Sequence, residues 1–223
     1  MRAALRETRL WQALRSLRRG LRRIDAAVLS PIKGRLGVAM PMDTPDRRVL
    51  EQIILPHYAG RDDVRTVLFV GCESYTSHYQ RWFRGRSYWT IEPDRAKSCY
   101  GSRNHVVDVI EHLDRHFEPH SLDLIVCNGV IGFGLDRREN AELAFQRCFE
   151  SLRDRGELVV GWNDVAEFRP FRPDDIASLG WFEHRAFPPL GAWRHHTGSE
   201  LRHVFDFYVR PAGERGARTA TDA

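Results

Sequence analysis

The 223-residue sequence contains no run of 18 or more consecutive apolar residues, the length that a membrane-spanning helix requires. It also lacks a continuous apolar segment near the N-terminus, so a secretory signal peptide is not indicated. No C-x-x-C pair occurs among the four cysteines, Cys72, Cys99, Cys127 and Cys148. Their wide spacing excludes an obvious zinc site or disulfide framework, and we expect no metal and a reducing, cytoplasmic setting.

Lysine is nearly absent, and the arginines that replace it are unevenly distributed. Residues 1–35 carry ten Lys and Arg against two acidic residues, a net charge of +8. The remaining residues carry 24 basic and 28 acidic side chains, a net charge of −4. The pI of 9.1 therefore belongs to an N-terminal arm and not to the rest of the chain. A domain of negative net charge without a basic patch is not expected to bind nucleic acid.

The arm has the spacing of an amphipathic helix over residues 3–29. Its apolar residues recur every three or four positions, at Leu10, Leu14, Leu17, Leu21, Ile24 and Val28. One interpretation is a helix on an anionic membrane surface, at the inner face of the membrane, or on a partner. Packing across the chain's own domain and an Arg-rich transit peptide remain as alternatives. We divide the chain into the arm and connector (1–45), one domain (46–211) and a disordered tail (212–223).

The centre of the sequence predicts a strand that is followed by a glycine turn and then by a helix. Thr66 to Val70 is an apolar, β-branched run, Gly71 ends it, and a helix is predicted over 76–84. The N-terminus of such a helix offers unpaired N–H groups, and the glycine lets a ligand approach the backbone. Glu92 ends the next apolar run, 21 residues after Gly71. An acid at this distance is placed to bind the ribose hydroxyls of a nucleoside.

Strand and helix patterns alternate along the domain. The expected strands are 66–70, 88–92, 104–107, 122–127, 157–162, 182–187 and 203–209. The expected helices are 46–58 (capped by Thr44 and ended by Gly60), 76–84, 109–116 and 139–153, with a short helix or turn at 94–100. In helix 139–153, Leu143, Ala144, Cys148 and Leu152 are expected on the inner side. This order predicts an α/β fold with a doubly wound, mostly parallel sheet.

Several segments in this order resemble the motifs of the class I S-adenosylmethionine-dependent methyltransferases. The segments are Val67–Cys72, Thr90–Asp94, His105–Asp108, Leu122–Val130 and Leu152–Val160. The resemblance implies a Rossmann-like sheet of seven strands with an antiparallel terminal strand, and S-adenosylmethionine as the cofactor. It assigns Glu92 to the cofactor ribose and Asp108 to the adenine. It also implies that the end of the fourth strand, at Asn128 and Gly129, faces the reacting methyl group.

The glycine loop, residues 71–76 after the first strand, departs from the family pattern. Only Gly71 of the usual three glycines remains, Phe69 stands at the usual acid position, and Glu73 and Tyr75 replace the later glycines. Our hypothesis is that Glu73 accepts hydrogen bonds from the cofactor's ammonium group, with Thr76 as a further polar partner. The alternative, of equal weight, is that Glu73 caps the following helix or forms an ion pair with an arginine. The predicted cofactor residues are Gly71, Cys72, Glu73, Thr76, Glu92, Asp108, Asn128 and Gly129.

Methyl transfer from a sulfonium depends mainly on positioning, and a base is needed only for a weakly acidic acceptor such as a hydroxyl. The candidate catalytic residues are Asn128, at the end of the fourth strand, Asp164, after the fifth, and the pair His195 and His196 before the last strand. Structural roles remain open for each, since Asp after a strand often bonds its own backbone. The sequence favours O-methylation of a small molecule or of a glycan or lipid precursor.

Two other functions remain open. A nicotinamide-dependent oxidoreductase would need G-x-G-x-x-G after the first strand, and Gly71-Cys-Glu-Ser-Tyr-Thr lacks it. A non-catalytic module with a degenerate cofactor loop, attached to a membrane or partner by its basic helix, is the other alternative. The presence of both Glu92 and Asp108 speaks against this second alternative.

Overall fold

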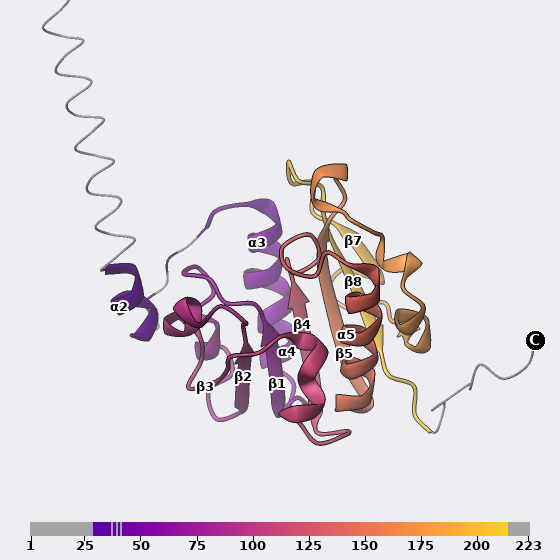
Figure 1. Cartoon of the computed structure of the whole chain (residues 1–223), viewed down its shortest axis with the longest axis horizontal. Helices are drawn as coiled ribbons and strands as arrows, with labels where there is room; N and C mark the ends of the chain where they lie inside the picture. The colour runs from indigo at the N-terminus through magenta and orange to yellow at the C-terminus, as the bar shows by residue number, and fades with distance from the viewer. Residues whose placement is uncertain (1–28, 37, 39, 41, 214–223) are drawn as a thin grey trace, which may run out of the picture.

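The structure is a computed structural model that describes residues 29–36, 38, 40 and 42–213 (Figure 1). The predicted basic helix lies almost wholly outside these residues, as does the tail from residue 214. The strands are β1 (Thr66–Val70), β2 (Ser87–Ile91), β3 (Asn104–Val106), β4 (Leu122–Asn128), β5 (Leu152–Asn163), β6 (Glu183–His184), β7 (Arg194–His196) and β8 (His203–Val209). The α-helices are α2 (Ser30–Arg35), α3 (Pro45–Val49), α4 (Leu55–Ala59) and α5 (Arg138–Ser151).

Shorter helical turns connect these elements. The π-helical segment η2 (Leu50–Ile54) joins α3 to α4. The 3₁₀ turns are η3 (Tyr79–Arg81), η4 (Arg95–Tyr100), η5 (Ile110–Arg115), η6 (Ala166–Phe168), η7 (Pro173–Asp175) and η8 (Ala177–Trp181). Among the described helices, none is long and apolar enough to cross a membrane.

The strands form one mixed sheet in the order β3-β2-β1-β4-β5-β8-β6. The first five strands pair in parallel, and β8 runs antiparallel to β5, with Gly161 opposite Phe205. This confirms the predicted doubly wound sheet with an antiparallel terminal strand. The edge differs from the prediction: the strand expected at 182–187 is only two residues long, because the unpredicted β7 pairs with Val204–Asp206 of β8 and β6 pairs only with Tyr208 and Val209.

Side chains of the central strands alternate between two hydrophobic cores, one on each face of the sheet. Leu68, Ile125 and Val160 pack on the face covered by α5, together with Phe145. Their strand neighbours point to the opposite face, where Leu50, Ile54 and Tyr58 of the 45–59 helical segment cover them. Figure 1 shows these two helical layers on either side of the sheet. Burial on both faces explains why the strands read as continuous apolar runs.

The predicted helix 46–58 is confirmed as the uninterrupted series α3, η2 and α4, which ends at Gly60. Pro56 lies inside this series and has no N–H for an ordinary helical hydrogen bond. The wider π turn before it accommodates that loss. Thr44 occupies the N-cap position as expected, but its side chain makes no capping hydrogen bond.

Two helix predictions were wrong in detail. Residues 76–84 form a series of turns around η3, because Thr76 and Ser77 bond the carbonyl oxygens three residues before them and so compete with a helical ladder. Leu143, expected on the inner side of α5, is exposed. The inner face of α5 carries the expected Ala144 and Cys148 together with Ala141 and Phe145, whereas Leu152, also expected there, lies beyond α5 as the first residue of β5.

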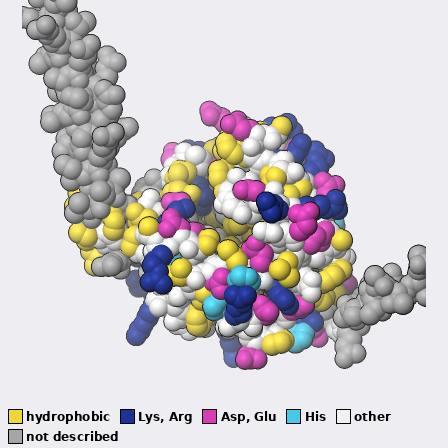
Figure 2. All heavy atoms as spheres, in the orientation of Figure 1, with side chains coloured by type: hydrophobic (Ala, Val, Ile, Leu, Met, Phe, Trp, Pro, Cys, Tyr) yellow, Lys and Arg dark blue, Asp and Glu magenta, His cyan; other side chains and the backbone are white. Residues whose placement is uncertain are grey.

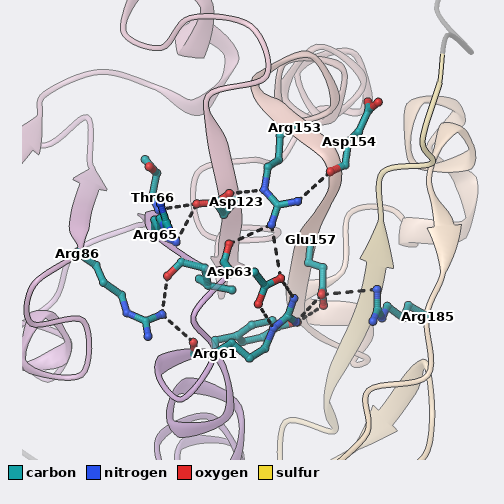
Figure 3. Close-up of polar contacts among 12 residues, drawn as sticks. Arg61, Asp63, Arg65, Thr66, Arg86, Asp123, Arg153, Asp154, Glu157 and Arg185 are labelled. Carbon is teal, nitrogen blue, oxygen red and sulfur yellow. Dashed lines mark hydrogen bonds and ion pairs between the residues drawn. The ribbon is translucent and has the colours of Figure 1, made fainter.

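Charged residues are linked where the central strands begin (Figure 3). Asp123 accepts hydrogen bonds from the backbone N–H groups of Arg65 (2.8 Å) and Thr66 (2.7 Å) and pairs with Arg153. The buried Glu157 contacts Arg61 Nη1 at 2.5 Å. This network joins β1, β4 and β5 at the end of the sheet opposite to their carboxyl termini, so it fixes the scaffold and leaves the carboxyl ends for a site.

Candidate active site

A cavity of about 830 Å³ opens at the carboxyl ends of β1, β2 and β4. Its wall is formed by the loops after these strands, by residues 42–47 and by the segment that leads into β8. All eight residues predicted to bind a cofactor contribute to this wall: Gly71, Cys72, Glu73, Thr76, Glu92, Asp108, Asn128 and Gly129. The switch from β1 to β4 in strand order is the place where open α/β sheets bind ligands.

Glu92 joins the first two loops of the cavity. Its Oε2 accepts a hydrogen bond from the backbone N–H of Cys72 at 3.1 Å, and its Oε1 accepts one from Asp94 at 3.0 Å. The residue is 8% exposed and lies directly after β2. Each carboxylate oxygen has two lone pairs, so this side chain retains acceptor capacity toward the cavity. The Cys72 thiol is unreactive here, because burial raises its pKa to about 12.

Glu73 and Thr76 close the loop after β1. The Thr76 hydroxyl donates to the carbonyl oxygen of Glu73 at 3.0 Å and accepts from the Glu73 backbone N–H at the same distance. The Glu73 carboxylate contacts Nζ of Lys97, from η4, at 2.6 Å. This ion pair raises the pKa of Lys97. Glu73 therefore meets a lysine, where the sequence left an arginine or a helix cap as the alternative to a ligand.

Asp108 follows β3 and is held by two histidines. Its carboxylate lies 2.8 Å from His112 Nδ1 and 2.8 Å from His116 Nε2, and it accepts the backbone N–H of Val109. Burial raises the pKa of this carboxyl, but the hydrogen bonds from His116, His112 and Val109 lower it to well below its usual range. Asp108 is an ionised acceptor whose oxygens already have several partners.

A buried polar cluster lies where β4, β5 and β8 meet. His203 Nε2 is 3.0 Å from Oδ1 of Asn128, and its Nδ1 is 2.7 Å from Oδ1 of Asn163. All three side chains line the cavity. Burial lowers the pKa of His203 to about 4, so its ring is neutral near pH 7. A neutral imidazole donates one hydrogen bond and accepts one, so one of the two amides turns its NH₂ group to the ring.

Arg47 enters the cavity wall from α3. Its guanidinium lies 4.4 Å from the ring of Tyr75, and Nη1 donates to the Tyr79 hydroxyl at 3.2 Å. Its Nε is buried without a hydrogen-bond partner among the described residues, with Asp46 Oδ2 at 3.8 Å. The buried Thr44 Oγ1, in the same wall, likewise has no hydrogen-bond partner within the described part of the chain. This region offers donors to an anionic group.

Asp164, His195 and His196 are not part of the cavity wall. Asp164 is buried and contacts Arg169, Arg172 (3.7 Å) and Arg202 (3.2 Å). His195 and His196 belong to β7, where they pair with Phe205 and Val204 of β8. Of the four predicted catalytic residues, the structure brings only Asn128 to the cavity.

Comparison with known proteins gives structural matches only. No protein-family model and no curated protein sequence matches the chain. N-methyltransferase NodS from Bradyrhizobium japonicum WM9 is 15% identical, with 75% of this chain and 97% of that chain covered and a TM-score of 0.56. Its complex with S-adenosyl-L-homocysteine is 17% identical, with 76% and 89% covered and a TM-score of 0.55. A TehB-like SAM-dependent methyltransferase from Corynebacterium glutamicum is 14% identical, with 88% and 97% covered and a TM-score of 0.51.

The chain has the fold of the S-adenosylmethionine-dependent methyltransferases. Within this methyltransferase fold, Arg47, Lys97 and His203 are residues of the cavity wall that sequence reasoning did not assign to the site. Neither Arg47 nor Lys97 belongs to a sequence motif that indicates a ligand-binding site. The position of His203 in the sequence could have indicated its place in the site. It begins the strand that pairs with β5 and therefore lies near the carboxyl end of the parallel strands. Among the described residues, the cavity wall thus contains one histidine, His203, and it is not one of the two predicted.

Proposed function

We propose that this protein is an S-adenosylmethionine-dependent methyltransferase that acts on a small molecule or on a glycan or lipid precursor. The observation that carries the proposal is the position of Glu92. In a sheet with the methyltransferase fold, a buried carboxylate at the end of β2 ties down the glycine loop and borders the cavity. A carboxylate in this position suits the two ribose hydroxyls of a nucleoside cofactor. The neighbouring NodS structure contains S-adenosyl-L-homocysteine, which supports this choice of cofactor.

The cavity wall has features that fit such a cofactor. Gly71 and Gly129 adopt positive φ angles of 86° and 68°. A Cβ at Gly129 would meet nothing within 4 Å, and one at Gly71 would meet only Val130, at 3.8 Å. These positions leave the backbone open to close approach by a ligand. The cofactor supplies, when bound, a methyl group activated by a sulfonium.

The residues also match the charges of the cofactor. Glu92 would accept from the ribose hydroxyls, and Asp108 with the neighbouring Val109 would border the adenine. For the amino-acid part we assign the ammonium group to Glu73 and the carboxylate group to the guanidinium of Arg47. Within the described chain, Arg47 Nε has no hydrogen-bond partner, which supports this last assignment because a buried donor is stabilised by gaining an acceptor.

We further propose that the acceptor atom is a hydroxyl oxygen and that His203 takes its proton. His203 is the one histidine in the cavity wall among the described residues. Because its ring is neutral near pH 7, one ring nitrogen has a lone pair, and this nitrogen would exchange its contact with an asparagine amide for the acceptor hydroxyl before it takes the proton. Contact of the other ring nitrogen with the second asparagine orients the ring. Asn128, which contacts Nε2 of the ring, would position the acceptor. Asp164 is a weaker candidate for the base, since arginines already engage its carboxylate.

The test is transfer of a labelled methyl group. The protein is incubated with methyl-labelled S-adenosylmethionine and a cell extract separated into small-molecule, glycan and lipid fractions. Label that enters one fraction, and that is lost with Glu92→Ala, supports the proposal and names the acceptor class. His203→Gln should lower this transfer by about 10²-fold or more while cofactor binding persists. Label in no fraction, despite cofactor binding, favours the non-catalytic module.

A further inference from the structure

The short helix α2 is attached to the domain by one face. A Cβ at Gly34 would lie 2.6 Å from Cδ1 of Tyr100 and 2.7 Å from the carbonyl oxygen of Cys99. Only a glycine permits this approach, so α2 is packed closely against η4. The position of Gly34 therefore fixes which face of α2 points away from the domain.

The opposite face of α2 is apolar and exposed. Leu29, Ile32 and Leu36 are 47%, 51% and 69% exposed, and their spacing places them on one side of a helix. Five of the eleven large exposed hydrophobic residues of the described chain fall within residues 29–42. Figure 2 shows hydrophobic side chains gathered at α2, on the left of the view. An exposed apolar cluster of this kind marks an interaction surface.

This face continues the apolar series of the arm. In the sequence, the series that runs from Leu10 to Val28 proceeds in steps of four to Ile32 and Leu36. At both positions where the structure describes it, the series points to solvent. Exposed side chains at these two positions are not expected if the apolar series packs against the chain's own domain. The exposure of Ile32 and Leu36 therefore favours a partner outside the domain.

The charge around this face indicates what the partner is. Residues 1–35 carry a net charge of +8, and the rest of the chain carries −4. An apolar stripe flanked by arginines, with Trp11 beside it, is the pattern of a segment that lies in the interface of an anionic bilayer. Nucleic acid would use the arginines but would leave the apolar stripe in water. We propose that the apolar face of α2 and the basic arm bind together to an anionic membrane surface.

The domain would then be held with its cavity near the bilayer. Met42, six residues beyond Leu36, already forms part of the cavity wall. The binding itself does not depend on the proposed enzymatic activity.

The experiment is co-sedimentation of the full chain with lipid vesicles. Phosphatidylcholine vesicles that contain about one third phosphatidylserine are compared with vesicles of phosphatidylcholine alone. We expect binding to the anionic vesicles, and about tenfold weaker binding for the double variant Ile32→Glu/Leu36→Glu. The control is Trp82→Glu/Leu143→Glu, which adds the same charge at two exposed apolar residues outside this face and should bind within about twofold of the wild type.

A second variant tests the charge. Replacing Arg18, Arg19, Arg22 and Arg23 by Gln should weaken binding to anionic vesicles, and salt should weaken the wild type in the same way. Urea unfolding checks that each variant retains an intact domain, and this control does not depend on whether the protein binds S-adenosylmethionine. The proposal is overturned if the wild type does not sediment with anionic vesicles, or if Ile32→Glu/Leu36→Glu binds as well as the control. A dimer that this variant breaks, without vesicle binding, would assign the face to a second copy of the chain.

Discussion

His203 Nε2 lies 3.0 Å from Oδ1 of Asn128, although 75 residues separate the two in sequence. The contact forms above Gly161, where an added Cβ would lie 1.9 Å from Asn128 Oδ1 and 2.9 Å from His203 Nε2. The missing side chain of Gly161 therefore makes room for the polar cluster of the cavity.

Gly161→Ala should disrupt this cluster. The methyl group overpacks a buried site, so we expect the free energy of unfolding to fall by about 2–3 kcal/mol. Gly180→Ala is the matched control, because a Cβ there meets nothing within 4 Å. The control should change stability by about 0.5 kcal/mol or less. Urea unfolding of both variants measures the difference, and equal values for the two would contradict the assigned role of Gly161.

The stability of the protein should depend on pH through His203. Burial lowers the folded-state pKa to about 4, below the value of about 6.5 for an unfolded histidine. The stability from this neutral ring is therefore fully present above about pH 6.5 and is lost as the pH falls toward about 4. Between about pH 7.5 and 4.5, we expect this one side chain to reduce the free energy of unfolding by roughly 2–3 kcal/mol.

Comparison with His203→Gln isolates that effect. All other ionisable side chains are the same in both proteins, so their contribution cancels in the difference. Urea unfolding at the two pH values should show a smaller decrease for the variant than for the wild type. Parallel decreases would mean that His203 is not buried in its neutral form.

Substitution of Glu73 and Lys97 tests the proposed contact between Glu73 and the ammonium group of the cofactor. If Glu73 binds the ammonium group, Glu73→Ala weakens S-adenosylmethionine binding at least about tenfold, or 1.4 kcal/mol. The variant leaves the Lys97 ammonium without its carboxylate partner in the cavity wall. Lys97→Ala removes a competing cation and should leave binding unchanged or tighter. Calorimetry measures the dissociation constant for S-adenosylmethionine in both variants. An unchanged value for Glu73→Ala would mean that Glu73 and Lys97 have only a structural role.

The ion pairs at the opposite end of the sheet should affect stability without affecting ligands. Glu157 is 4% exposed and accepts hydrogen bonds from the Tyr58 hydroxyl at 2.9 Å and from Arg61. Glu157→Ala leaves the buried Tyr58 hydroxyl without its acceptor, while Arg61 keeps its hydrogen bonds to Asp63, so the substitution should cost about 1–3 kcal/mol of unfolding free energy. The exposed residue Glu118 provides the control substitution Glu118→Ala. A loss of cofactor affinity in Glu157→Ala, at a temperature where it remains folded, would contradict this separation of scaffold and site.

The sequence predicted the sheet well because burial on both faces leaves a strong local signal. The runs around Leu68, Ile125 and Val160 are apolar for their full length, and a glycine or polar residue ends each of them. Turn chemistry was harder to predict. Thr76 and Ser77 look like helix-start residues, yet their side chains bond backward to the loop and prevent the helix.

The site was predicted where a residue follows a strand directly. Glu92, Asp108 and Asn128 come after β2, β3 and at the end of β4, and the parallel register brings them to one edge. Arg47 and Lys97 reach the cavity from helical segments, and no local pattern reveals that. His195 and His196 were chosen by residue type. Pairing of β7 with β8 puts them outside the cavity wall, while His203, at the start of β8, lies in it.

The most direct test of the account is a calorimetric titration with S-adenosylmethionine and, separately, with NAD. The wild type is compared with Glu92→Ala and with Glu118→Ala, which removes the same charge from the surface. We predict micromolar binding of S-adenosylmethionine, about −8 kcal/mol, to the wild type and to Glu118→Ala. Glu92→Ala should lose this binding, and NAD should bind to none of the three. Absence of S-adenosylmethionine binding to the wild type, or equal binding to Glu92→Ala, would contradict the account.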